Sequence, residues 1–423
     1  MSETIVLAYS GGLDTSVATK WLQEERGYDV VCLLADLGNQ PDVVSARERG
    51  LGAGARSVEV VDAREDFLRY FAFPALAANA LYQGGYPLST ALGRPLIAKL
   101  LVDKAREVGA SAVAHGCTGK GNDQVRFDLA IRALAPDLTI VGTARENLMT
   151  RDEAIAYAAQ HSIPVHTTVE SPYSTDENLW GRSIECGILE DPWAEPPEDI
   201  YEWTRALDET PLEPSYVTVG FDHGVPVSLD GEALEPVPLV ERLNTLAGEH
   251  GVGRVDMVED RLVGIKSREI YEAPAAIALV EAHRALEALT LSRPQRAFKE
   301  RVAQEYAELV YDGLWFTAHH QDLAAYVQST QRHASGEVRL RLARGTAVAV
   351  GSQAPHSLYS HELATYGDGD RFDQAAAQGF IAIWGLPVQV QAEQQLLRQP
   401  GDPKMLATTP APDDGALTSD AGV

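Results

Sequence analysis

Five short apolar runs alternate with longer stretches of helical spacing in the first half of the sequence, and this alternation most restricts the fold. The runs are rich in β-branched residues and comprise Ile5–Ala8, Val30–Leu34, Val58–Val61, Ala112–Ala114 and Thr139–Val141. The helical stretches between and after them are Ser16–Glu25, Phe67–Leu81, Leu96–Val108 and Glu153–His161. Strand–helix alternation of this kind predicts an α/β fold in which helices cover both faces of a parallel sheet.

A glycine-rich loop follows the first apolar run directly. Ile5–Ala8 leads into Tyr9-Ser10-Gly11-Gly12-Leu13-Asp14-Thr15-Ser16, where a helix is predicted to begin at about Asp14–Ser16. Two adjacent glycines let the backbone adopt positive φ and approach a ligand closely. Backbone N–H groups and the positive end of the following helix would then form an anion cradle, to which the hydroxyls of Ser10, Thr15 and Ser16 add donors. The alternative is a capped helix start after a glycine turn, but the position in the first βα unit favours a phosphate loop.

Asp14 is unusual in such a loop, because a carboxylate beside a phosphate repels it unless a cation intervenes. It therefore predicts Mg²⁺ that bridges to a pyrophosphate. A Walker A loop is excluded because Gly119-Lys120 is followed by Gly121, and the three-glycine dinucleotide spacing is absent. The loop instead resembles that of N-type ATP pyrophosphatases, which cleave ATP between the α and β phosphates. Ala35, at the end of the second run, would lie beside the adenine.

A second polar loop, His115–Phe127, precedes another predicted helix. It holds three glycines, more than a simple turn requires. Thr118, Asn122 and Asp123 can together bind an amino group and a carboxylate. Arg126, one helical turn after Asn122, offers a planar fork suited to a carboxylate, although a surface salt bridge is the alternative for it.

The overall charge excludes several classes of function. With 35 basic and 61 acidic side chains, the net charge is −26, which argues against a nucleic-acid binder and against docking on anionic membranes. No apolar run reaches the roughly 18–20 residues that span a bilayer, and Met1–Ile5 lacks the features of a signal peptide. The three cysteines are scattered and form no disulfide framework or zinc cluster. We therefore expect a cytoplasmic, reduced protein.

The second half of the sequence has a mixed order of elements. The Pro-, Ser- and acid-rich segments Ser171–Asp176 and Asp191–Glu198 predict a long ordered loop or linker, and Tyr216–Phe221 with Val225–Ser228 predict a β-hairpin. Further helices are predicted at Val240–Glu249, Ala275–Thr290 and Gln295–Val310, and further strands at Val338–Leu342 and Ala347–Val350. This order indicates an α+β second domain. Gln389–Arg398 predicts a projecting helix, and the proline-rich tail after Gln399 predicts disorder.

Several segments, in the same order along the chain, resemble the argininosuccinate synthase family. They are Ala8–Ser16, Tyr86–Lys99, His115–Phe127, Ser174–Trp180, Gly251–Arg254, Val258–Arg261, Lys266–Pro274, Ser357–Tyr359 and Trp384–Pro387. That family joins L-citrulline to L-aspartate while it consumes ATP and releases AMP and pyrophosphate. The resemblance runs from about Ile5 to Pro387 and leaves out the tail after about Arg398.

Position by position, the resemblance implies which residues bind each substrate. ATP would bind Ala8, Tyr9, Ser10, Gly11, Gly12, Leu13, Asp14, Thr15, Ser16, Ala35 and Gly116. Aspartate would bind Thr118, Asn122 and Asp123, and citrulline would bind Tyr86, Asn122, Arg126, Ser174, Ser183, Glu259 and Tyr271. Many members have Thr-Ser where this chain has Thr90-Ala91, so a hydroxyl contact at position 91 is missing here, and whether Thr90 replaces it stays open.

The resemblance also implies a division of the chain. It gives a nucleotide-binding domain at 1–168, a citrulline- and aspartate-binding domain at 169–365, a C-terminal oligomerisation segment at 366–398 that forms a homotetramer, and a tail at 399–423. No side-chain nucleophile is needed, because the ureido oxygen of citrulline would attack the α-phosphate and the aspartate amine would then displace AMP. Asp14, through Mg²⁺, and Asp123, as one candidate proton acceptor beside a phosphate oxygen, would be the catalytic groups.

Two other readings remain. The chain could be another AMP-forming ATP pyrophosphatase, such as a GMP synthetase, NAD synthetase or tRNA thiolase. It could also be a nucleotide sensor without catalytic activity.

Overall fold

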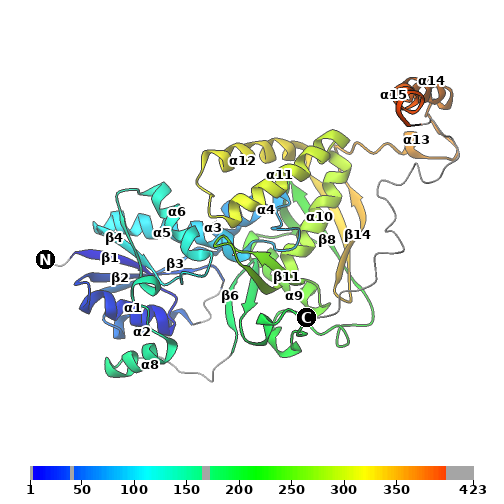
Figure 1. The fold of residues 1–423 in the computed structure, drawn as a ribbon. Helices are drawn as coiled ribbons and strands as arrows, with labels where there is room; N and C mark the ends of the chain where they lie inside the picture. Colours follow the sequence, from blue (N-terminus) through cyan, green and yellow to red (C-terminus); the bar gives the residue numbers. More distant parts are fainter. Residues whose placement is uncertain (1–2, 39–41, 164–171, 397–423) are drawn as a thin grey trace, which may run out of the picture. The chain divides into compact units, whose positions relative to one another are not determined.

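All five apolar runs of the first half become parallel strands of one sheet (Figure 1). The computed structural model describes residues 3–38, 42–163 and 172–396. Within them the sheet has the order β3-β2-β1-β4-β5. Its strands are β1 (Thr4–Ala8), β2 (Asp29–Asp36), β3 (Ser57–Asp62), β4 (Ala112–His115) and β5 (Thr139–Gly142). The prediction of a parallel α/β sheet is therefore confirmed.

Helices cover both faces of this sheet, which explains why its strands are apolar throughout. They are α1 (Leu13–Glu24), α2 (Val43–Gly52), α5 (Ser89–Val108), α6 (Asp123–Leu134) and α7 (Thr143–Glu146), and α8 (Arg151–Gln160) packs against α1. Along β1, Ile5 and Leu7 pack with Trp21 of α1. Val6, which points to the opposite face, packs in the cluster that holds Leu101 of α5.

The helix predicted over Phe67–Leu81 is divided into three segments. These are α3 (Arg64–Phe67), the wider turn η1 (Leu68–Ala72) and α4 (Phe73–Ala78). Pro74 has no N–H to donate to the carbonyl of Tyr70, and the N–H of Phe73 instead reaches back to Leu68. The segment ends early because Asn79 adopts a left-handed conformation, with φ of 56°.

After the segment that forms the parallel sheet, the chain forms an antiparallel sheet that the sequence analysis did not predict. Its order is β11-β12-β7-β6, from β6 (Ser174–Asn178), β7 (Gly181–Glu185), β11 (Arg254–Asp260) and β12 (Lys266–Glu272). The prediction that Ser171–Asp176 is loop is wrong from Ser174 onward. These strands are dense in charged residues, so they lack the apolar alternation by which strands are recognised. Asp191–Glu198 remains largely loop between η2 (Gly187–Glu190) and η3 (Glu198–Ile200).

A third sheet contains the predicted hairpin. Its order is β10-β9-β8-β13-β14, from β8 (Ser215–Asp222), β9 (Val225–Leu229), β10 (Glu232–Ala233), β13 (Gly336–Ala343) and β14 (Thr346–Gln353). Each predicted helix of this region lies within a longer one. They are α9 (Pro236–Glu249), α10 (Pro274–Thr290) and α11 (Arg293–Tyr311), and α12 (Ala318–Thr330) and η4 (Gln331–His333) were not predicted.

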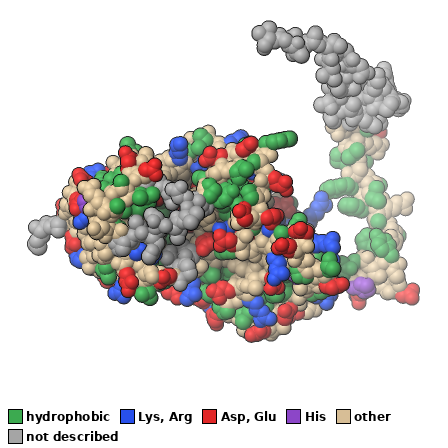
Figure 2. Space-filling view, turned by 90° about the horizontal axis from the view of Figure 1, so that it is seen from below, with side chains coloured by type: hydrophobic (Ala, Val, Ile, Leu, Met, Phe, Trp, Pro, Cys, Tyr) green, Lys and Arg blue, Asp and Glu red, His purple; other side chains and the backbone are tan. Residues whose placement is uncertain are grey.

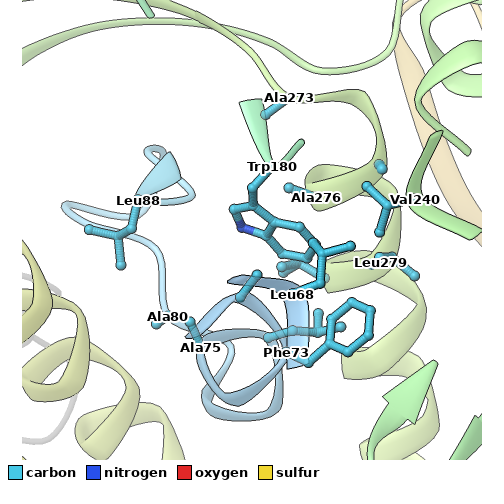
Figure 3. Packing of buried hydrophobic residues seen from close by; sticks show 14 of the residues in the cluster. Leu68, Phe73, Ala75, Ala80, Leu88, Trp180, Val240, Ala273, Ala276 and Leu279 are labelled. Atoms are coloured by element: carbon cyan, nitrogen blue, oxygen red, sulfur yellow. The ribbon is translucent and has the colours of Figure 1, made fainter. Parts of the chain in front are cut away.

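Trp180, in the β6–β7 turn, is central to the largest hydrophobic cluster. Figure 3 shows its indole among Leu68, Val240 and Leu279, which come from η1, α9 and α10. Its Nε1 donates a hydrogen bond to the carbonyl of Pro87, at 3.1 Å. The cluster thus fixes the 86–89 segment against the second sheet.

The chain divides into two compact units, Met1–Leu358 and Tyr359–Val423. The second contains α13 (His361–Ala364), α14 (Gln374–Trp384), α15 (Leu386–Gln391) and η5 (Ala392–Leu396). The helix predicted from Gln389 therefore begins three residues earlier, with Pro387 in its first turn, where its missing N–H is not needed. Arg398 and the predicted disordered tail 399–423 lie outside the described residues. The domain boundaries at 168 and 365 stay predictions.

Side chains of both charges lie on the surface. On the face shown in Figure 2, acidic, basic and apolar side chains are interspersed. Among the described residues no helix is both long and apolar enough to cross a membrane.

Candidate active site

The phosphate loop connects the carboxyl end of β1 to α1. Gly11 has φ of +80°, and a Cβ there would lie 2.8 Å from the Cβ of Ala46. The loop is held by its own hydroxyls, since the Oγ of Ser10 lies 3.1 Å from the Oγ1 of Thr15, and the hydroxyl of Tyr9 lies 3.0 Å from the Oγ of Ser16. Only glycine fits the close approach at position 11.

Arg49 of α2 anchors this loop, which the sequence analysis missed. Its Nε donates to the carbonyl of Gly11 at 2.8 Å. The bond turns that peptide so that its oxygen faces α2 and brings a guanidinium group beside the loop. Arg49 lies 38 residues from Gly11, so no local pattern could reveal the contact.

Asp14 lies in the first turn of α1 and is exposed. Among the described residues, no hydrogen bond or ion pair engages its carboxylate. It lines a cavity of about 250 Å³ together with Gly116 and Thr118, from the second loop. An unengaged carboxylate at the edge of an anion cradle fits Mg²⁺, which takes one or two protein carboxylates and completes its shell with phosphates and waters. Ala35, half-buried, lies near the carboxyl end of β2, next to β1.

The predicted substrate residues come together around one cavity of about 260 Å³. The second loop and α5 form one side of it, and the antiparallel sheet of β6, β7, β11 and β12 forms the other. The predicted residues that line it are Tyr86, Thr90, Gly116, Thr118, Asn122, Asp123, Arg126, Ser174, Ser183, Glu259 and Tyr271. Gly116 and Thr118 line both this cavity and the one beside Asp14, so the two are adjacent.

Arg126 of α6 is buried, with 4% of its surface exposed, yet one of its nitrogens is free. Its Nε donates to the carbonyl of Tyr311 at 2.8 Å, and its Nη1 donates to Oδ1 of Asp123 at 2.8 Å. Nη2 has no partner among the described residues. A buried guanidinium N–H without an acceptor is costly, so a ligand carboxylate at this position would be bound strongly.

Tyr311, at the end of α11, positions two of the predicted residues. Its ring lies 4.8 Å from the Cζ of Arg126, and its hydroxyl accepts a 2.7 Å hydrogen bond from Nδ2 of Asn122. The Oδ1 of Asn122 accepts from the N–H of Leu262 at 3.0 Å. Both ends of the Asn122 amide are therefore engaged within the protein, which leaves one N–H and one lone pair for a ligand.

Arg94 of α5 joins two carboxylates at the cavity. Its Nε donates to Asp123 at 2.9 Å, and its Nη2 donates to Asp176 of β6. Burial acts to raise the pKa of Asp123, but Arg94 and Arg126 outweigh it and lower that pKa below the ordinary value. Burial, with the nearby charge of Asp123, raises the pKa of Asp176 against the opposing effect of Arg94. Asp176 is thus the more basic of the two.

Tyr86 and Tyr271 form one wall of the cavity. Their rings stack with centroids 4.1 Å apart. The Tyr86 hydroxyl accepts from the N–H of Thr90 at 3.0 Å, in the first turn of α5, and the Tyr271 hydroxyl donates to Glu259 at 3.0 Å. Burial raises the pKa of Tyr86 to about 12 and also raises the pKa of Glu259.

Two carboxylates share one guanidinium at the far side of the cavity. Arg261 pairs with both Glu185 and Glu269. Burial and then the charges of Glu185 and Glu259 raise the pKa of Glu269 to about 9. Glu185, Glu269 and Asp176 lie on strands that the sequence analysis did not recognise, and this is why they were missed, whereas Arg261 directly follows β11.

The remaining predicted residues fit the cavity in different ways. Thr90 lines it together with Asp176, while Ala91 is buried and does not line it. Ser183 donates to the carbonyl of Asp176 at 3.3 Å, and Ser174 is exposed. Cys117 also lines the cavity, but burial raises the pKa of its thiol, which does not favour a nucleophile.

Comparisons with known proteins define first the class and then the family. Residues 4–164 match the arginosuccinate synthase N-terminal HUP domain, and residues 173–391 match the arginosuccinate synthase C-terminal domain. The chain is therefore an α/β enzyme with a HUP domain at its start.

Curated relatives cover nearly the whole chain. An argininosuccinate synthase from Dehalococcoides mccartyi is 54% identical over 395 residues, which are 93% of this chain and 97% of that protein. One from Rubrobacter xylanophilus is 59% identical over 385 residues, 91% of this chain and 94% of that protein. Among solved structures, a predicted subunit of tRNA methyltransferase from Methanocaldococcus jannaschii is only weakly similar. Its TM-score is 0.26 and its identity 14%, over 37% of this chain and 75% of that chain. The chain belongs to the argininosuccinate synthase family, whose members are ligases.

Proposed function

We propose that this chain joins L-citrulline to L-aspartate through a citrullyl-adenylate and releases AMP and pyrophosphate. The observation that supports this most directly is the free Nη2 of the buried Arg126. It lies in a cavity that shares Gly116 and Thr118 with the cavity beside Asp14 of the phosphate loop. A carboxylate-binding group and an anion cradle at adjacent positions suit an amino acid that reacts with a nucleotide.

The proposed nucleotide site is the carboxyl end of the parallel sheet, where such folds bind ligands. Ala8–Ser16 would hold the phosphates, Ala35 would lie beside the adenine, and Gly116 would allow close approach at the end of β4. Asp14 would hold Mg²⁺, which would neutralise charge on the departing pyrophosphate.

The proposed amino-acid sites divide the larger cavity. Arg126 would bind the citrulline carboxylate, and Glu259 with Tyr271 would bind its ammonium group. Tyr86, Asn122, Ser174 and Ser183 would complete the citrulline site. Thr118, Asn122 and Asp123 would bind aspartate, and Thr90 would contribute a hydroxyl at the edge.

The proposed chemistry relies on positioning rather than on a nucleophilic side chain. A ureido oxygen is a poor nucleophile, so it must be held in line with the α-phosphate. Its attack forms a bond to that phosphorus and breaks the bond to pyrophosphate. The aspartate amine then adds to the activated carbon, and AMP leaves with the former ureido oxygen.

The amine must lose a proton in the second step. Asp123 was the side chain predicted for this role, but its two guanidinium partners lower its pKa and suit it better to fixing Arg126 and Arg94. The raised pKa of Asp176 makes it the better proton acceptor. We therefore propose Asp176 as the base and Asp123 as a group that orients the site.

The second unit supports the proposed homotetramer. Of the described residues of α14, none is buried. Phe380, Ile381, Ile383 and Trp384 are all more than 60% exposed. An apolar face of this kind marks an interaction site, and the family resemblance sets the number of subunits at four. We also propose a cytoplasmic enzyme with small-molecule substrates and no nucleic-acid or membrane partner, in keeping with three free cysteines and a net charge of −26.

A coupled pyrophosphate-release assay tests the proposed function. Release should require citrulline, and argininosuccinate should form only when aspartate is also present. Release with xanthosine monophosphate or a deamidated NAD precursor instead would favour another AMP-forming ligase. Binding of ATP without release under any of these conditions would favour a nucleotide sensor.

A further inference from the structure

A polar cavity of about 410 Å³ lies between α10, α11 and the 79–84 segment. It shares no lining residue with the cavity of the candidate active site. Arg284 of α10 and Arg296 of α11 line it, and the buried Lys299 lies between them and the protein interior. Arg296 and Lys299 are three residues apart, so they lie on the same face of α11.

Positive charge predominates in this lining, although the chain as a whole has a net charge of −26. Arg284 and Arg296 are exposed, and neither forms an ion pair with another described residue. Lys299 is 2% exposed and donates to Glu287 and to the carbonyl of Ala77, which leaves its third N–H. The acids of the lining are Glu287 and Glu300.

Glu287 is not free to neutralise the arginines. Its carboxylate already accepts from Lys299, from Nε2 of Gln331 at 2.7 Å and from Nδ2 of Asn79 at 2.7 Å. Glu300 is exposed at the rim, so it is hydrated and less effective. Lys299 and Glu287 neutralise each other, so the two unpaired arginines, Arg284 and Arg296, face one unengaged carboxylate, that of Glu300.

His283 lies behind the cavity, and its Nε2 is 3.8 Å from Oε1 of Glu287. Both of its neighbours present amide oxygens to it, with Oδ1 of Asn79 2.7 Å from Nδ1 and Oε1 of Gln331 2.9 Å from Nε2. Both amides are fixed in this orientation because their NH₂ groups donate to Glu287. A neutral ring can donate to only one oxygen, yet burial lowers the pKa of His283 to about 4. An anion bound in the cavity would add to the charge of Glu287 and favour the charged ring, which can donate to both oxygens.

We propose that this cavity binds a small polyanion with at least two negative charges, as carboxylate or phosphate groups. The two guanidinium forks suit bidentate contacts, and the third N–H of Lys299 provides a donor at the base. A volume of about 410 Å³ is within the usual range for small-molecule sites.

The position of the cavity connects it to the substrate site. Asn79, Leu81 and Gly84 line it, and Tyr82 of the same segment donates to the carbonyl of Asp260 at 2.7 Å and stacks on Tyr311 at 3.5 Å. Gln83 and Asn79 have positive φ values of 48° and 56°, which cost energy outside glycine. A bound anion would therefore order the segment that leads to Tyr86.

The test uses the full-length protein with inorganic phosphate and citrate as separate probes, at constant ionic strength, measured by calorimetry. The cavity variant is Arg284→Gln with Arg296→Gln, and its control is Arg293→Gln with Arg301→Gln, which removes two exposed charges of α11 that do not line the cavity. Wild type and control should bind at least one probe saturably, and the cavity variant should bind it about tenfold or more weakly. The probe that binds identifies the group as carboxylate or phosphate.

Hydrogen exchange supplies the second measurement. Amides of residues 79–86 should exchange more slowly with the bound probe in wild type and control, but not in the cavity variant. Equal affinity in all three proteins, as expected if phosphate bound only at the phosphate loop, would overturn the proposal. So would the absence of saturable binding of either probe to wild type.

Discussion

Nη1 of Arg126 lies 2.8 Å from Oδ1 of Asp123, one turn earlier on α6, and the same guanidinium has an unpartnered Nη2 at the cavity. Asp123 and the carbonyl of Tyr311 thus occupy two of its three nitrogens. The arrangement orients a cation before any substrate arrives, which reduces the ordering cost of binding.

Arg126→Lys should raise the apparent KM for citrulline far more than the KM for ATP. An ammonium group cannot keep the contacts to Asp123 and Tyr311 and also bind a carboxylate, a loss of about 1–3 kcal/mol or roughly 10- to 100-fold. Steady-state kinetics with each substrate varied in turn measures the effect. Arg132→Lys, at an exposed position of the same helix, is the control. An equal rise in both constants would indicate a structural role.

Asp14→Asn should sharply lower kcat and leave the unfolding temperature unchanged. Asp14 is exposed and engages no other described side chain, so its loss removes the proposed Mg²⁺ ligand and little else. Asp152→Asn, in the first turn of α8, controls for the loss of a carboxylate near a helix N-terminus. Normal turnover by Asp14→Asn across a magnesium titration would refute the metal role.

If Asp176 is the base, the pH profile of kcat should have an acidic limb whose pKa lies above the usual range for aspartate. Its pKa is raised in the folded protein, so the carboxylate is protonated up to a higher pH and cannot accept a proton there. Activity should therefore fall as pH decreases through that pKa. Asp176→Asn should remove the limb and lower kcat by about 100-fold or more with little change in the KM for citrulline. Asp199→Asn should behave as wild type, and an unchanged pH profile in Asp176→Asn would exclude Asp176 as the base.

The apolar face of α14 should determine the size of the assembly. Phe380 and Trp384 stack with centroids 5.7 Å apart and are both exposed. Phe380→Ser with Trp384→Ser should reduce the mass measured by light scattering. Deletion after Pro387, which keeps α14 but removes η5 and most of α15 from the same unit, should reduce it as well. Deletion of only the residues after Gln399, or Gln378→Ser in the same helix, should leave it unchanged. A constant mass in every variant would contradict the proposed role of the second unit.

The sequence predicts the parts of this structure that leave a local pattern, such as an apolar run or a glycine-rich loop, better than the parts that depend on pairing between distant residues. The parallel strands are apolar on both faces, and the phosphate loop is local, so both were predicted. The strands Arg254–Asp260 and Lys266–Glu272 alternate charged and apolar residues imperfectly, because their charged side chains pair across the sheet and at the cavity. No short-range pattern indicates such pairs.

The same limit applies to the candidate site. Arg126 and Asp123 were predicted because they lie one turn apart in a polar loop. Tyr311 and Arg49 were not, because they contact that site across 185 and 38 residues of sequence. Residues that position a site from distant elements become visible only when the fold brings them together.

The most direct test of the central claim follows one oxygen atom. If the ureido oxygen of citrulline attacks the α-phosphate, it must leave with AMP when aspartate reacts. Citrulline labelled with heavy oxygen in its ureido group should therefore give labelled AMP and unlabelled pyrophosphate by mass spectrometry. Formation of argininosuccinate with unlabelled AMP would contradict the adenylate mechanism, and label in orthophosphate would indicate attack on the γ-phosphate instead.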